Sequence, residues 1–231
     1  MKKNKTLKTA FPHTLPVMTG YLFMGTAFGI LLVTSGYSPV WAPIMALTVF
    51  AGSMQFVAIG ILTSPFGLLS AFFLTIMVNA RHLFYGLSML DKFKNTGKKK
   101  LYMIFSLTDE TYSLHCSLLP PPDVDENLFR FYIALLNHFY WISGCTFGAL
   151  LGSFIPFSTK GIDFVMTALF VVIFIEQWEK SKNHTSALCG VLITFFCLLI
   201  FGTQIFLIPA LAGIMILLLF ARPHIIEKRE K

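Results

Sequence analysis

Apolar residues fall in long runs along this chain, and short polar stretches separate the runs. A helix that crosses the hydrocarbon core of a membrane needs about 20 mostly apolar residues. By that measure the pattern predicts an all-α integral membrane protein, a polytopic helical bundle of about six to eight membrane segments within a single domain, 1–231. The candidate segments are 15–35, 41–62, 66–90, 101–119, 128–153, 163–178, 185–201 and 204–221.

Composition strengthens this interpretation. Hydrophobic residues make up 55% of the 231 residues and charged residues only 13%, against roughly 25% charged in an average soluble chain. The mean hydropathy is +0.72. At this composition a soluble protein would have too few polar side chains for its water-exposed surface. A disordered chain needs far more polar residues. Both classes are therefore excluded.

The net charge of +7 is carried by a few short basic stretches between apolar runs. Lysines precede the first run, others form the loop Lys92–Lys100, and Arg222 begins a basic carboxy terminus. Basic loops of this kind are typical of the cytoplasmic side of a membrane, where they also contact anionic lipid. We therefore expect the protein to interact with the lipid bilayer and not with nucleic acid. We also expect the amino terminus to lie in the cytoplasm.

The positions of the basic loops disagree with the number of apolar runs if every run crosses the membrane completely. Three full crossings from a cytoplasmic amino terminus would place Lys92–Lys100 outside, against the positive-inside rule. Broken or re-entrant segments resolve the conflict, and in transporters such segments line the substrate site. We predict breaks at three places: Ala51–Ser53, Asn79–His82 and Thr203-Gln204.

Glycines recur at four-residue spacing in both halves of the chain. This spacing lets two helices approach closely, so we predict a packing role for them. The same pattern leaves an internal duplication open, with possible repeat halves 13–90 and 128–221. The packing glycines are Gly25 and Gly29 in the first half and Gly144, Gly148 and Gly152 in the second.

One polar cluster lies deep within the apolar run 66–90. Asn79 and His82 share a helical face, and Arg81 and Tyr85 lie beside it. Ionisable groups in a membrane are costly and are functional candidates by default. Arg81 could hold a carboxylate bidentately, or pair with an acid on another helix. The alternative is that Arg81 extends to the membrane interface and His82 follows it.

A second cluster lies in 101–119, where Ser106, Asp109 and Ser113 would form one polar stripe of a helix and Glu110 adjoins Asp109. These acids could accept an ammonium group, bind Arg81, or carry a proton. An amphipathic interfacial helix with both acids in water is the alternative. Asn137, His138 and Trp141 form a third cluster, which we interpret as core packing. We interpret Glu176 as marking a helix that leaves the membrane.

Enzyme signatures are missing from the sequence. There is no H-E-x-x-H motif, no serine-nucleophile elbow and no phosphate-binding loop. The histidines lack metal-site spacing, and the four cysteines lie in apolar segments without a C-x-x-C pair. We expect no enzyme, no cofactor and no metal. Gradient-driven transport remains, and the alternatives are a structural or assembly subunit and a channel.

Three motifs carry a resemblance to a known family. Phe50–Phe56 (F-A-G-S-M-Q-F), Val78–Gly86 (V-N-A-R-H-L-F-Y-G) and Thr108–Tyr112 (T-D-E-T-Y) occur in the order and spacing of the AzlC family, which the chain resembles over nearly its whole length. That family supplies the large subunit of branched-chain amino acid exporters. The resemblance implies export of branched-chain or similar apolar amino acids from bacteria, across the cytoplasmic membrane, with a small AzlD-type membrane subunit.

Combined with the residue patterns, the resemblance leads to a hypothesis of secondary, alternating-access transport. The substrate would bind at the middle of the membrane between the broken segments near 51–56 and 79–86. Proton coupling or an ion pair would involve Asp109 or Glu110. The candidate substrate-binding residues are Gly52, Ser53, Gln55, Asn79, Arg81, His82 and Tyr85. The carboxy-terminal half has no comparable motif, so the particular amino acid stays open.

Overall fold

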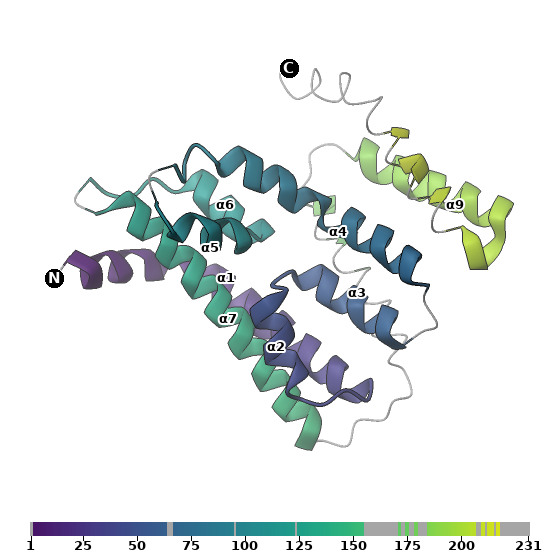
Figure 1. Ribbon diagram of the computed structural model, residues 1–231, viewed down its shortest axis with the longest axis horizontal. Coiled ribbons are helices and arrows are strands. Elements are labelled where there is room, and N and C mark those ends of the chain that lie inside the picture. Colours follow the sequence, from purple (N-terminus) through teal and green to yellow (C-terminus); the bar gives the residue numbers. More distant parts are fainter. Residues whose placement is uncertain are drawn as a thin grey trace. The chain divides into compact units, whose positions relative to one another are not determined.

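The computed structural model describes residues 2–63, 67–94, 96–122, 124–154 and 184–206, with short stretches at 171, 174–175, 178–179, 209–210, 212–214 and 216–217. Within these ranges the regular structure is helical and contains no strand (Figure 1). The chain divides into two compact units. The first comprises 1–66 and 78–162, and the second 67–77 and 163–231. Each unit is described separately below.

Two long helices, α1 (Lys2–Thr34) and α7 (Glu126–Phe154), pack against each other in the first unit (Figure 1). All five predicted packing glycines lie in their contact. A Cβ on Gly144 would lie 2.7 Å from the carbonyl oxygen of Tyr21, and one on Gly25 would lie 2.9 Å from the amide nitrogen of Cys145. These distances are too short for any side chain, so the backbones touch directly.

The same contact continues along both helices. A Cβ on Gly29 would overlap backbone atoms of Cys145 and Ala149, and one on Gly148 would overlap Thr26. A Cβ on Gly152 would lie 3.2 Å from the Cα of Ile30. We call this contact the α1–α7 seam.

The predicted segment 41–62 consists of two helices. α2 (Trp41–Thr48) and α3 (Gly52–Thr63) are separated by Val49–Ala51, directly beside the expected break. Phe50 has a φ of 40°, which strains a side chain of this size. Its buried ring stacks on that of His138 at 4.2 Å between centroids. Packing therefore holds the unusual backbone in place.

The predicted segment 101–119 is also divided, which the apolar pattern did not indicate. α5 (Lys99–Phe105) ends before Ser106, and α6 (Asp109–Ser117) begins after Thr108. The Thr108 side chain caps α6 by accepting a hydrogen bond from the backbone N–H of Thr111. The predicted polar stripe from Ser106 through Asp109 is therefore wrong, because these residues are not in one helix.

The expected break at Asn79–His82 is wrong as well. α4 (Leu68–Met89) runs through these residues as a continuous helix, because none of them is a glycine or proline that would break a helix. Its first ten residues belong to the second unit and the remainder to the first. In α9 (Thr185–Ile205) the backbone leaves helical geometry at Gly202, beside the expected break at Thr203-Gln204.

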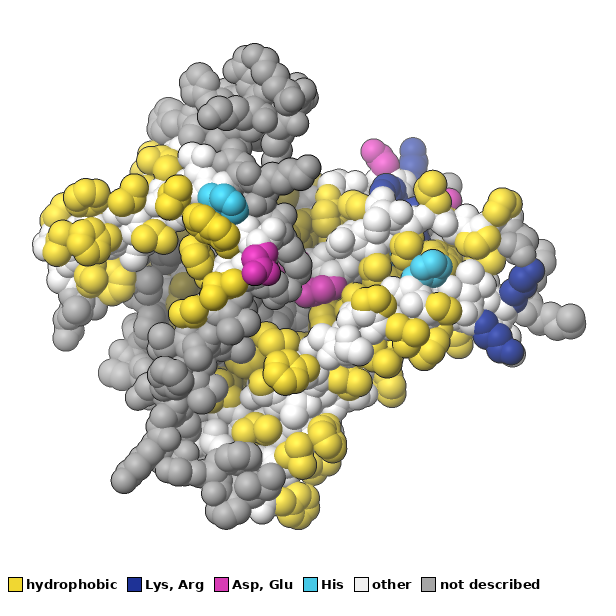
Figure 2. Space-filling model, turned by 180° about the vertical axis from the view of Figure 1, so that it is seen from behind, with side chains coloured by type: hydrophobic (Ala, Val, Ile, Leu, Met, Phe, Trp, Pro, Cys, Tyr) yellow, Lys and Arg dark blue, Asp and Glu magenta, His cyan; other side chains and the backbone are white. Residues whose placement is uncertain are grey.

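By length and composition, two of the described helices can cross a membrane, at Asn4–Thr34 and Leu68–Met89. Both present large apolar side chains at the surface: Phe23 is 76% exposed and Leu83 71%, which suits contact with lipid. Figure 2 shows hydrophobic side chains over much of the described surface on one face. The count of six to eight segments and the internal repeat stay predictions. Most of segments 163–178 and 204–221, and Glu176, lie outside the described residues.

Candidate functional site

An ion pair between two helices of the first unit forms the centre of the site. Nη1 of Arg81 (α4) lies 2.8 Å from Oδ2 of Asp109 (α6). The two side chains are 33% and 32% exposed. Nη2 of Arg81 donates to the hydroxyl of Ser53 in α3 at 2.7 Å, and the Tyr85 hydroxyl donates to Asp109 at 2.9 Å. Ser53, Arg81, Tyr85 and Asp109 therefore form one connected group, which we call the α3–α4–α6 junction.

Both helix breaks contribute to this junction. Ser53 is the second residue of α3, directly after the first break, and Asp109 is the first residue of α6, directly after the second. The amide groups at a helix amino terminus favour negative charge. Asp109 therefore lies where both its own helix and Arg81 attract a negative group. The start of α3 offers a similar environment to an anion near Arg81.

The neighbouring acid, Glu110, has a different set of partners. Its carboxylate accepts a hydrogen bond from the Tyr21 hydroxyl of α1 at 2.8 Å. The Tyr21 oxygen lies 2.5 Å from the Thr108 hydroxyl oxygen, which lies 3.0 Å from that of Thr111. The side-chain amide of Asn137 (α7) donates to Thr111 at 3.0 Å. Adjacent acids thus connect α6 to different helices, Asp109 to α4 and Glu110 to α1.

Trp141 of α7 fixes the start of α3. Its indole N–H donates to the side-chain oxygen of Gln55 at 2.7 Å. A Cβ on Gly52 would lie 3.2 Å from the Trp141 ring, so this position has little room for a side chain. Gln55 is fully buried, so it acts on the interior side of α3, whereas Ser53 contacts Arg81.

Four buried polar atoms of the site residues have no hydrogen-bond partner. Two are donors, Nε2 of Gln55 and Nε of Arg81, and two are acceptors, Oδ1 of Asn79 and Oδ1 of Asn137. An unpaired buried polar atom is unfavourable by about 1–3 kcal/mol, so such atoms mark places where a ligand or water binds. These two donors and two acceptors are available for further hydrogen bonds.

The remaining predicted residues lie at the edge of this group. His82 contacts the Tyr85 ring edge-on at 5.8 Å between centroids. His138, interpreted from sequence as a core residue, is satisfied by the Tyr102 hydroxyl at 2.9 Å and the Ala46 carbonyl at 3.2 Å. The sequence interpretation missed Tyr21, which lies in an apolar run. It also missed the Thr108-x-x-Thr111 cap, although threonine followed by two acids is a helix-start signal.

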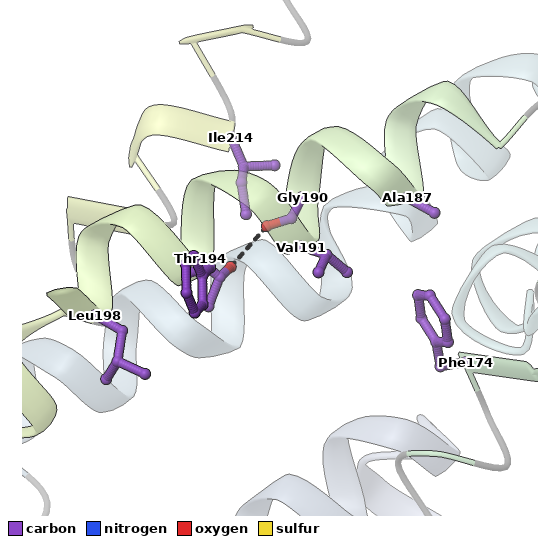
Figure 3. Close-up of a pocket in the computed structure, with 8 residues that line it drawn as sticks. Phe174, Ala187, Gly190, Val191, Thr194, Leu198 and Ile214 are labelled. Carbon is purple, nitrogen blue, oxygen red and sulfur yellow. Dashed lines mark hydrogen bonds between the residues drawn. The ribbon is translucent and has the colours of Figure 1, made fainter.

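The second unit contains a different cavity, of about 520 Å³, shown in Figure 3. Its lining is apolar and includes Phe174, Val191, Leu198 and Ile214. The hydroxyl of Thr194 already donates to the Gly190 carbonyl at 2.8 Å. This lining suits a hydrocarbon chain, and the described residues that form it include no charged group for a zwitterion.

Metal chemistry finds no support within the described ranges, where no group of three His, Cys, Asp or Glu side chains is placed to hold an ion. The cysteines Cys116, Cys145, Cys189 and Cys197 are free thiols. The site is therefore a set of charged, hydroxyl and amide side chains that can bind an ionic or zwitterionic molecule.

Comparison with known proteins gives a consistent result. Residues 16–155 match the family described as "AzlC protein". The chain is 49% identical to the "Branched-chain amino acid transport protein AzlC" of Bacillus subtilis, over 96% of this chain and 87% of that protein. It is 43% identical to an "Uncharacterized membrane protein" of Haemophilus influenzae, over 91% and 87%. It is 27% identical to the "Inner membrane protein YgaZ" of Escherichia coli, over 87% and 84%. No solved structure matches the chain.

Proposed function

The chain belongs to the AzlC family, and from that premise we propose that it exports branched-chain or similar apolar amino acids across a bacterial cytoplasmic membrane. Transport is secondary, with alternating access and proton coupling, and uses a small AzlD-type membrane subunit. The observation that carries this proposal is the partly exposed Arg81–Asp109 pair, in which Asp109 is the first residue of α6 and Arg81 also contacts Ser53 at the start of α3.

A zwitterion can replace this ion pair without changing the charge of the site. The substrate carboxylate takes the place of Asp109 on Arg81, and its ammonium group takes the place of Arg81 on Asp109. Both protein charges are then still paired, which matters because an uncompensated charge in a membrane is costly. A simple acid or amine would leave one of them unpaired. The pair therefore favours molecules that carry both groups.

Two unpaired atoms add directional contacts. Nε of Arg81 is free to donate to a carboxylate, and Oδ1 of Asn79, two residues away in α4, is free to accept from an ammonium group. The start of α3 near Gly52 favours the carboxylate further. His82 and Tyr85 border the same space. We assign substrate binding to this set, and proton coupling to Asp109 or Glu110.

The test is efflux of valine, leucine, isoleucine and methionine from cells expressing the chain with and without the small subunit. Arg81→Gln and Asp109→Asn should each lower efflux by roughly 10- to 100-fold at normal protein levels. Lys94→Gln and Asp91→Asn, which remove exposed charges outside the site, are the matched controls. Full efflux in both site variants would refute the assignment.

A charge-swapped variant separates binding from scaffolding. Arg81→Asp combined with Asp109→Arg restores an ion pair between α4 and α6. If the pair is purely structural, as expected of an assembly subunit, efflux should return in this double variant. A substrate site would not recover it, because the substrate groups would meet charges in reversed positions.

A further inference from the structure

The directions of the helices in the first unit follow from the order of their contacts. In the α1–α7 seam, Gly25 of α1 lies against Cys145 of α7. One turn further along α1, Gly29 lies against Ala149, which is one turn further along α7. Both residue numbers rise together, so the two helices are parallel and begin at the same end of the unit (Figure 1). In a membrane, α1 and α7 therefore start on the same side.

α6 runs in the opposite direction to α7. Near its start, the hydroxyl of Thr111 accepts a hydrogen bond from the Asn137 amide at 3.0 Å. Near its end, the backbone carbonyl of His115 accepts one from Arg130 at 2.8 Å. Residue numbers rise along α6 while those of the partners fall along α7, so the two helices are antiparallel. α6 therefore ends on the side of the unit where α1 and α7 begin.

The second half of α4 follows the direction of α6. The hydroxyl of Tyr85 donates to Asp109 at 2.9 Å. The hydroxyl of Ser88 then donates to that of Tyr112 at 3.2 Å. These contacts advance together along both helices, so α4 and α6 are parallel. α4 therefore ends where α1 and α7 begin, and the basic loop Lys92–Lys100 starts on that same side.

α5 and α6 form a hairpin that leaves this side and returns to it. Lys99, the first residue of α5, lies over the Phe131 ring of α7 at 5.0 Å. The hydroxyl of Tyr102 lies 2.9 Å from Nδ1 of His138, so α5 runs parallel to α7 and away from this side. The 7 residues of α5 and the 9 of α6 span only about 10 and 14 Å, against a hydrocarbon core of about 30 Å. Neither helix is long enough to cross.

α2 and α3 form a second hairpin, which starts from the opposite end of the unit. α2 begins soon after the end of α1 and leads back to Phe50, whose ring contacts that of Tyr21 at 6.3 Å between centroids. α3 then returns, because its Leu62 carbonyl accepts from the hydroxyl of Tyr37, beyond the end of α1, at 2.9 Å. Their 8 and 12 residues span only about 12 and 18 Å. These helices are also too short to cross.

The tips of the two hairpins meet near the middle of α7. The rings of Phe50 and Phe105, one from each tip, are 6.5 Å apart between centroids. His138, near the middle of α7, contacts both hairpins. Its ring nitrogens lie 3.2 Å from the Ala46 carbonyl of α2 and 2.9 Å from the Tyr102 hydroxyl of α5. Each hairpin therefore reaches the same level of the unit from its own end.

The distribution of charge distinguishes the two ends. The end at which α1 and α7 begin carries the lysines of Lys2–Lys8 and of the loop Lys92–Lys100. The sequence has no Lys, Arg, Asp or Glu from Thr9 to Ala80, so the turn after α1 and the connection from α3 to α4 are uncharged. Basic residues concentrate on the cytoplasmic side of membrane proteins. This rule assigns the charged end to the cytoplasm.

We infer that α2–α3 and α5–α6 are half-membrane hairpins that enter the bilayer from opposite sides, α2–α3 from the outside and α5–α6 from the cytoplasm. α1, α4 and α7 cross between the two sides, which places Lys92–Lys100 in the cytoplasm although α4 is unbroken. At the tips, Ser53 of the external hairpin and Asp109 of the cytoplasmic hairpin both bind Arg81 of α4. For transport the inference rests on the proposed function: a substrate at this pair has one hairpin toward each side of the membrane.

Labelling of single cysteines in whole cells tests this topology. The 4 native cysteines are replaced by alanine, and one cysteine is then introduced at an exposed position on either flank of each hairpin. Ser38 and Gly67 flank α2–α3, and Lys94 and Pro122 flank α5–α6. Each variant is expressed with the small subunit and treated with a membrane-impermeant maleimide before and after permeabilisation. Ser38→Cys and Gly67→Cys should label in intact cells, whereas Lys94→Cys and Pro122→Cys should label only after permeabilisation.

The members of each pair are matched controls, because a full crossing would separate them. If every apolar run crossed, Gly67→Cys would be protected in intact cells and Lys94→Cys would label there. Either result, or Lys94→Cys and Pro122→Cys on different sides, overturns the hairpins. Labelling of the α5–α6 pair in intact cells with protection of the α2–α3 pair would reverse the sides and overturn the assignment. A position that stays unlabelled after permeabilisation lies in lipid, which also contradicts the inference.

The labelling does not depend on transport, so the two proposals can fail separately. If the labels fall as expected and the cells export none of the amino acids named above, the proposed function is wrong and the topology stands. If the cysteine-free protein exports leucine but Gly67→Cys is protected in intact cells, the topology is wrong and the proposed function stands.

Discussion

The α1–α7 seam and the α3–α4–α6 junction bring helices together in opposite ways. At the seam, the glycines have no side chains, so the backbones are in direct contact, as between Gly29 and Cys145. At the junction, charged and hydroxyl side chains bridge the helices, as between Arg81 and Asp109. A seam of backbone atoms has only one good fit, whereas an ion pair can exchange partners with a ligand. We therefore expect the seam to act as a fixed frame and the junction as the part that responds to substrate.

The largest effect is expected at the seam. Gly29→Leu would place a side chain into backbone atoms of α7, and overpacking of this kind costs typically about 1–3 kcal/mol and occasionally more. No rotamer relieves a clash with backbone, so we expect loss of most folded protein from the membrane. Gly20→Leu is the control, because a Cβ on Gly20 meets no atom within 4 Å. The amount of each variant in the membrane is measured by quantitative immunoblot. Equal amounts of both would contradict the claim that folding needs the close backbone contact of the seam.

The junction should show loss of activity without loss of protein. In Arg81→Gln the amount of folded protein should stay normal, because both charged side chains are partly exposed. Loss of a charged hydrogen bond of about 1.5–3 kcal/mol predicts that leucine efflux falls by roughly 10- to 100-fold. The measurement is initial efflux rate per folded molecule. A proportional fall in protein amount would indicate that Arg81 is structural.

A second arginine provides the structural counterpart. Arg130 is buried; it donates to Glu126 within α7 and to the backbone carbonyl of His115 in α6. Arg130→Gln should lower the stability by about 1–3 kcal/mol, seen as a lower melting temperature in detergent. Efflux per folded molecule should stay within about twofold of normal. Loss of efflux with unchanged melting would remove the distinction between the two arginines.

The smallest effect is expected between the seam and the junction, at Trp141. Trp141→Phe keeps an aromatic ring beside Gly52 but removes the hydrogen bond to Gln55. A net contribution of about 0.5–1.5 kcal/mol predicts roughly a two- to tenfold weaker apparent affinity for leucine. Gln55→Leu should produce a similar change, and the double variant should be no weaker than either single one. Additive losses would mean that the two residues act independently.

The same comparison explains which parts the sequence could predict. Glycines at four-residue spacing have one common meaning in a membrane helix, so all five seam glycines could be identified in advance. The break before Gly52 was also indicated by small residues. The predicted break at Asn79–His82 is wrong because polar side chains alone do not interrupt a helix: these residues are compatible with helical backbone, and Arg81 finds its partners on other helices.

The partners of the site could not be predicted. Tyr21 is 89 residues from Glu110 in the sequence, and its hydroxyl in an apolar run gives no local sign of a role. Arg81 and Asp109 were both identified as costly charges, but their pairing depends on how α4 meets α6. The start of α6 at Thr108 was readable from its cap, yet the surrounding apolar residues suggested one longer helix.

The most direct test of the account measures how Arg81 recognises the substrate carboxylate. Binding of leucine and of its amine analogue without a carboxylate is compared between the unmodified protein and Arg81→Gln, by calorimetry in the presence of the small subunit. We predict that the unmodified protein prefers leucine strongly and that Arg81→Gln binds the two compounds almost equally, a coupling of about 1.5–3 kcal/mol. If Arg81→Gln weakens both compounds by the same factor, Arg81 does not contact the carboxylate and the central claim is wrong.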